Sequence, residues 1–70
     1  MLRKYVVSSN LKSVGYDEKS RILEIEFKDG GTYQYSNVDA DEYNNLLSAP
    51  SKGKYFHRNI KNNYEYKKVR

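Results

Sequence analysis

Hydrophobic and polar residues alternate most regularly in the middle of the chain. In the segment RILEIEF, residues 21–27, the apolar side chains of Leu23, Ile25 and Phe27 alternate with Glu24 and Glu26. This period of two is typical of a strand with one face toward a core and the other toward solvent. The polar turn KDGG follows, and TYQYSNV has the composition of a returning strand. The pattern therefore predicts a β-hairpin over residues 21–38.

The length of the hairpin loop decides which face of the sheet carries Tyr33 and Tyr35. A loop of three residues, 29–31, with a glycine bulge places Phe27 opposite Tyr33 and both tyrosines on the apolar face. A loop of two residues, 29–30, would place both tyrosines on the outer face. Only polar side chains of the returning strand would then face the core, so we expect the three-residue loop and tyrosines that are at least partly structural.

The two ends of the chain have weaker patterns. In KYVVSSNLKSVGYD, Val6 and Val7 favour a strand, and the run SSN can bend it. Gly15 lies between two larger residues, which suggests a bulge or a close backbone approach. The tail EYKKVR is either an edge strand or a free end.

Helix signals lie in the C-terminal half. Asp39 followed by Glu42 is a capping-box pattern for one helix, and Ser51 can cap a second helix. These elements predict an α+β fold, in which a small antiparallel sheet (the hairpin 21–38 plus an N-terminal strand) is packed by two short C-terminal helices. Seventy residues correspond to a single domain over residues 1–70, and a chain of this length buries only about 60% of its unfolded surface.

The positive charge is concentrated near the C-terminus. Residues 51–70 contain seven basic residues and one acidic residue (7 − 1 = +6), whereas residues 1–50 contain six basic and eight acidic residues (6 − 8 = −2), and the sum is the net charge of +4. Such a concentration suits a site for phosphates. The plain alternative is a solvated basic tail. Opposite charges on the two parts would also suit a head-to-tail homo-oligomer.

Composition argues against several classes of function. The chain contains no cysteine, and His57 is its one histidine, so we expect no disulfide, no metal site and no cofactor. The sequence has neither a nucleophile-elbow pattern nor a phosphate-binding glycine loop, and we therefore expect no catalytic residues and no enzyme. No apolar run is long enough to span a membrane, and no signal peptide is recognisable. We expect a bacterial cytoplasmic protein. If a phage encodes the chain, we expect the protein in the cytoplasm of the host.

Five segments, taken in order, resemble the KTSC domain family: SSNLKSVGYD, LEIEF, YQY, LLSAPSKGKYF and NIKNNYEYKKV. This family is a short bacterial and phage domain with a Tyr-x-Tyr motif in its middle, and it also occurs at the C-terminus of some lysyl-tRNA synthetases. The resemblance implies a stand-alone copy with Tyr33-Gln34-Tyr35 as the central motif. RNA binding has been proposed for the family from its synthetase context. Such domains often carry a proline before the first helix, where this chain reads NVDADEY.

A binding module for RNA or another nucleic acid is our first functional hypothesis. Cationic side chains would contact phosphates, and tyrosine rings would stack on unpaired bases. The residues expected at such a ligand-binding site are Tyr33, Tyr35, Lys52, Lys54, Tyr55, Arg58 and Lys61. The plain alternative is that these cations form an ordinary outer helix face and that the tyrosines lie at the core edge.

Two other classes of function stay open. A small oligomer could hold or sequester a nucleotide-like small molecule at a subunit interface, because one copy has little volume for a deep pocket. A protein-interaction module could instead pair its sheet edge, or the SSN segment, with a strand of its partner.

Overall fold

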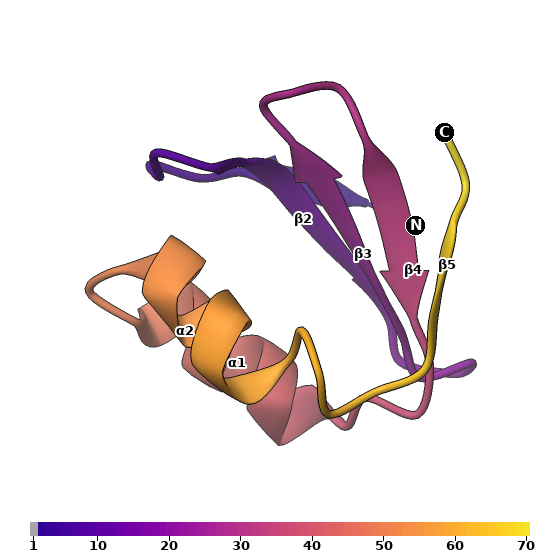
Figure 1. Cartoon of the computed structure of the whole chain (residues 1–70). Coiled ribbons are helices and arrows are strands. Elements are labelled where there is room, and N and C mark those ends of the chain that lie inside the picture. The colour runs from indigo at the N-terminus through magenta and orange to yellow at the C-terminus, as the bar shows by residue number, and fades with distance from the viewer. Residues whose placement is uncertain (1) are drawn as a thin grey trace.

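The sheet of the protein has five antiparallel strands, and both helices pack on one of its faces (Figure 1). The computed structural model describes residues 2–70, and its strands lie across the sheet in chain order, β1-β2-β3-β4-β5. This arrangement confirms the predicted α+β fold. The elements are β1 Arg3–Tyr5, β2 Leu11–Asp17, β3 Ile22–Phe27, β4 Thr32–Tyr35, α1 Ala40–Ser48, α2 Lys52–Asn59 and β5 Tyr66–Lys68.

The N-terminal segment forms two strands, where the sequence predicted one, and Val6 and Val7, which we expected in a strand, lie in the connection between them. Ser8 makes the turn between β1 and β2, because its Oγ accepts hydrogen bonds from the backbone N–H groups of Asn10 and Leu11, each at 3.2 Å. The bulge in this region lies between Leu11 and Ser13. No bulge occurs at Gly15, which is buried in regular pairing within β2, and the alternative of a close backbone approach there stays a prediction.

The β3–β4 hairpin has a three-residue loop, as predicted, but the loop begins one residue earlier. The N–H of Phe27 donates to the carbonyl oxygen of Gly31 (2.8 Å), and residues 28–30 form the loop. Gly30 has a φ of +106°, a backbone conformation that suits glycine at the last position of such a loop. Ile25 therefore pairs with Tyr33, whereas the expected partner of Tyr33 was Phe27. The face assignment is unaffected, because a shift of two residues in the pairing keeps the parity of the strand.

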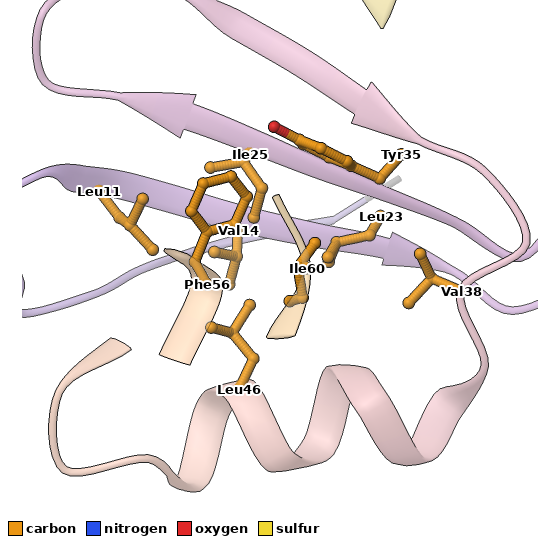
Figure 2. Close-up of a cluster of buried hydrophobic side chains, with 9 residues drawn as sticks. All are labelled: Leu11, Val14, Leu23, Ile25, Tyr35, Val38, Leu46, Phe56 and Ile60. Carbon is orange, nitrogen blue, oxygen red and sulfur yellow. The ribbon is translucent and has the colours of Figure 1, made fainter. Parts of the chain in front are cut away.

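Side chains from the sheet and from both helices form one hydrophobic core (Figure 2). Within the described residues its members are Leu11, Val14, Leu23, Ile25, Tyr35, Val38, Leu46, Phe56 and Ile60. Full burial of one such aliphatic side chain stabilises a fold by roughly 1.5–3 kcal/mol. Figure 2 shows Tyr35 at the margin of the cluster, where the core meets the sheet surface.

Both helices begin at the predicted caps. Oδ1 of Asp39 accepts from the N–H of Glu42 (3.0 Å), and Oγ of Ser51 accepts from the N–H of Lys54 (3.4 Å). The Glu42 carboxylate does not complete the capping box. It accepts the hydroxyl hydrogen bonds of Tyr55 and Tyr64, and so ties α1 to α2 and to the turn after it. Neither helix in residues 2–70 is long and apolar enough to cross a membrane.

Candidate functional site

The C-terminal tail is an edge strand, which answers a question that the sequence left open. Strand β5 pairs with β4, and this register places Tyr66 opposite Tyr35 and Lys68 opposite Tyr33. The N–H of Val69 extends the pairing by donating to the carbonyl oxygen of Thr32 (2.8 Å). In Figure 1, β5 runs along β4 at the edge of the sheet. The pairing brings the tail tyrosine beside the central Tyr-x-Tyr motif.

Five aromatic rings from four elements form a closed cycle of contacts. The cycle runs through Phe27, Tyr33, Tyr66, Tyr35 and Phe56. Successive ring centroids lie 5.3–5.9 Å apart, and three of the five pairs have the edge-to-face geometry that aromatic quadrupoles favour. The rings therefore hold one another in position without a deep core around them.

Exposure of the rings increases from one side of the cycle to the other. Tyr35 is 4% exposed and Phe56 is 6% exposed, whereas Phe27 and Tyr33 are half-buried and Tyr66 is 60% exposed. Burial, and the neighbouring hydroxyls of Tyr33 and Tyr66, raise the pKa of Tyr35 to about 12. Its hydroxyl is therefore protonated at neutral pH. The accessible ring surface belongs to Tyr66 and Tyr33.

All five rings line an open groove between α2, the β3–β4 loop and β5. The groove has a volume of about 1350 Å³ and is open to solvent on one side. Ser9 and Asn10, from the turn before β2, and Gly53 in the first turn of α2 line it together. Gly53 lies close to this turn, because a Cβ placed on it would be in ordinary contact with Oγ of Ser8, at 3.4 Å.

The groove contains most of the unbalanced positive charge of the protein. Its lining has six cationic side chains and one carboxylate, that of Asp29. The cations are Lys28, Lys54, Arg58, Lys61, Lys68 and Arg70. The rest of the chain has 13 − 6 = 7 basic residues and 9 − 1 = 8 acidic residues, so its formal charge is −1. Within residues 2–70, none of the six groove cations takes part in an ion pair.

The opposite face of the sheet has a different electrostatic character. There Arg3 forms ion pairs with Glu24 and with Glu26, whose Oε1 also accepts from Oγ of Ser13 (2.9 Å). Burial alone would raise the pKa of Glu24, but hydrogen bonds from Gln34 and Arg3 hold it below its ordinary value. On this face the charges satisfy one another. On the groove side, the six cations form no ion pair within residues 2–70.

The structure brings five of the seven expected site residues into the groove. These are Tyr33, Tyr35, Lys54, Arg58 and Lys61. Lys54, Arg58 and Lys61 all line the groove, although α2 ends at Asn59 and Lys61 lies in the turn after the helix, not on the helix face that we expected.

The other two expected residues lie outside the groove. Nζ of Lys52 donates to the carbonyl oxygen of Ala49 (3.1 Å), where it closes the end of α1. The hydroxyl of Tyr55 donates to Glu42, so this ring packs between the helices. No local pattern predicted the Glu42 contact, because it joins residues 13 positions apart.

Several lining residues were not expected from the sequence. They are Phe27, Lys28, His57, Tyr66, Lys68 and Arg70, together with the turn residues Ser9 and Asn10. The only local signal was in the tail, where Tyr66 and Lys68 alternate with Lys67 at the period of a strand.

Comparison with known proteins places this chain in a family. The family model of the KTSC domain matches residues 7–64. A protein of Stutzerimonas stutzeri is 39% identical over 70 residues, which are 99% of each chain. The crystal structure of a KTSC domain protein from Yersinia pestis, 42% identical, covers 99% of this chain and 97% of its own with a TM-score of 0.96. A lysine–tRNA ligase of Trichormus variabilis is 36% identical over 61 residues, and this match covers 87% of the chain but only 11% of the ligase.

Proposed function

The chain belongs to the KTSC domain family, and we propose that this KTSC domain is a non-enzymatic module that binds RNA or another nucleic acid in its groove. One observation carries the proposal: six cations that form no ion pair within residues 2–70 share a single groove with accessible aromatic rings. Phosphates need cations that are not already neutralised, and bases need flat apolar faces. The groove offers both on the same surface.

The shape of the groove favours a chain-like partner over a single nucleotide. Sites for small molecules are usually enclosed, occupy about 300–1,000 Å³ and bury 70–90% of the ligand surface. This groove is larger and open on one side. A polymer that enters and leaves the groove would use the open side, whereas a mononucleotide would remain largely solvated. The nucleotide-binding oligomer expected as an alternative would need a second copy to close the groove.

The relatives support RNA as the nucleic acid. A region similar to this chain forms part of a lysine–tRNA ligase, a protein whose name states that it acts on tRNA. Only 11% of that ligase corresponds to the chain, so its aminoacylation activity does not carry over. The proposal takes from it only the class of partner. A cytoplasmic location, where such RNA is found, is part of the same proposal.

Fluorescence anisotropy with a labelled RNA tests the proposal. The RNA should contain both a stem and a single-stranded tail, so that the test does not presuppose which form binds. We expect binding at 50 mM salt that weakens steeply by 200 mM, because bound counterions are released on association. We also expect that alanine at Lys54, Arg58 and Lys61 together abolishes binding at 200 mM salt. All three residues are exposed, so the substitutions leave the core intact.

A matched triple variant separates the groove from the net charge. Alanine at Lys4, Lys19 and Lys67 removes the same number of charges from exposed positions outside the groove. We expect this variant to keep most of the affinity of the unaltered protein. Equal losses in the two triple variants would show that only net charge matters, and would contradict a site in the groove.

A further inference from the structure

Tyr66 has a large aromatic ring that remains exposed to solvent in the fold. It lies on the edge strand β5, where all three residues are exposed, and 60% of its surface is accessible. Among the tyrosines of the aromatic cycle, only Tyr35 is needed to close the core. An exposed aromatic ring among cations is the usual arrangement for stacking on a base. We infer that the groove selects single-stranded nucleic acid and that Tyr66 and Tyr33 form its base-stacking platform; this inference rests on the proposed function.

The geometry of the two rings favours bases that are not stacked on each other. The ring centroids of Tyr33 and Tyr66 lie 5.9 Å apart, and the ring planes are tilted by 56°. One flat base cannot lie on both rings, so each ring faces a different base. In a duplex the bases are paired and stacked, and their faces are inaccessible. Unpaired bases can be splayed to meet tilted rings, which is why the platform requires a single strand.

Lys68 lies beside the platform. A Cβ placed on Gly31 would lie 3.1 Å from Cε1 of Tyr33 and 3.9 Å from Cε of Lys68, so the ring and the lysine side chain both pass over this glycine. The pairing of β4 with β5 agrees with this, because it places Lys68 opposite Tyr33. A base on Tyr33 would thus have a cation next to it. The glycine at position 31 leaves room for this arrangement.

The cations reach the groove from two sides. Lys54 and Arg58 come from α2 and Lys61 from the turn after it, and the remaining groove cations come from β5, the chain after it and the β3–β4 loop. A sugar–phosphate backbone that follows either side leaves its bases over the rings. Phosphate contacts position a strand, and stacking holds it without a requirement for sequence. We therefore expect weak preference among base sequences.

The test compares three labelled or competing probes on the full chain. A 12-nucleotide single-stranded RNA and a blunt 12-base-pair RNA duplex are titrated by anisotropy, and inorganic polyphosphate serves as a charge-only competitor. We expect the single strand to bind at least about tenfold more tightly than the duplex. Replacement of the ring in Tyr66→Ala should weaken single-strand binding about 5- to 150-fold, the range measured for loss of one base–aromatic stack.

Companion variants distinguish stacking from structural effects. Tyr66→Phe keeps the ring and should stay within about twofold of the unaltered protein. Tyr66→Leu keeps an apolar contact with Tyr35 but removes the flat face, and it should lose as much affinity as Tyr66→Ala. Tyr5→Ala is the matched control, because Tyr5 is 80% exposed on the other edge strand and outside the groove. This control should bind normally.

The outcomes separate this inference from the proposed function. Equal affinity for single strand and duplex, or unchanged binding by Tyr66→Ala and Tyr66→Leu, would overturn the platform while the groove remained a nucleic-acid site. Displacement of RNA by polyphosphate at equal phosphate concentration would likewise overturn it, because charge alone would then account for binding. Failure to bind either RNA at 50 mM salt would overturn both proposals.

Discussion

Lys67 and Lys68 provide a matched pair of substitutions with which to measure one phosphate contact. The two residues are adjacent on β5, and both are exposed. Successive side chains of a strand point to opposite faces, so Lys68 lines the groove and Lys67, opposite Gln34, does not. Neither residue forms an ion pair within the described part of the chain. Replacement by alanine therefore removes one charge without breaking an ion pair of the described residues.

The size of the effect follows from counterion release. Each phosphate contact on a single strand contributes about −0.7 to the slope of log affinity against log salt. If that contribution vanishes near 1 M salt, a contact at 50 mM is worth about 20^0.7, or roughly eightfold in affinity. At 200 mM it is worth about 5^0.7, or roughly threefold. We expect Lys68→Ala to show these two losses and a salt slope that is less steep by about 0.7.

Anisotropy titrations of one RNA at 50, 100 and 200 mM salt measure both quantities. Lys67→Ala should reproduce the affinity and the slope of the unaltered protein within about twofold, since its side chain lies on the opposite face of the sheet from the groove and makes no phosphate contact there. Two results would refute the reasoning. The first is an equal change of slope in both variants. The second is a loss in Lys68→Ala that does not depend on salt, which would indicate a damaged fold and not a lost phosphate contact.

Three further predictions concern stability. Glu42→Ala should lower the free energy of unfolding, measured by urea denaturation, by about 1–3 kcal/mol, because two tyrosine hydroxyls lose their acceptor. The control Asp41→Ala, at an exposed neighbouring position, should change it by less than about 0.5 kcal/mol. Burial raises the pKa of both Tyr35 and Tyr64 to about 12. The contribution of these protonated hydroxyls to the free energy of unfolding is therefore complete below pH 10 and is lost as the pH rises from 10 to 12. Urea midpoints that stay constant to pH 12 would contradict this. Gly30→Ala should cost about 1–2 kcal/mol by thermal denaturation, from its φ of +106° alone, because nothing lies within 4 Å of the added Cβ.

Local sequence signals predicted the central elements of the fold well. The alternation in RILEIEF assigns Leu23 and Ile25 to the core, and both are fully buried. The caps Asp39 and Ser51 are equally reliable, because a cap is a contact between residues three positions apart. Wherever the interacting residues are close in sequence, pattern and spacing were sufficient.

The errors lie where distant residues decide the outcome. Two adjacent glycines fit a three-residue hairpin loop in two ways, and only the pairing of β3 with β4 selects Gly30 for the positive φ. The bulge near Lys12 depends in the same way on how β2 meets β3. The alternation in a three-residue strand such as β5 is too short to distinguish an edge strand from a free end, and its place beside β4 did not follow from the sequence.

The same distinction between local and distant contacts applies to the candidate site. The helical spacing of Lys54, Arg58 and Lys61 is local, and the structure places all three in the groove. The contribution of Tyr66 depends on pairing between β4 and a segment about 30 residues later, which composition does not reveal. The sequence thus identified one side of the groove and missed the side that β5 builds.

Core and site share residues in this protein, and the sharing follows from its size. A 70-residue chain has too little interior to enclose five large rings. The aromatic cycle is therefore buried at Tyr35 and exposed to solvent at Tyr66. Substitution at Tyr35 would remove core packing and the support of the platform together, and a loss of binding there could not be assigned to either. Tyr66 lies at the exposed end of the cycle, where a ring can be exchanged at little cost to the core. The function of the groove is therefore best tested at its edge strand, although the Tyr-x-Tyr motif is its more prominent sequence feature.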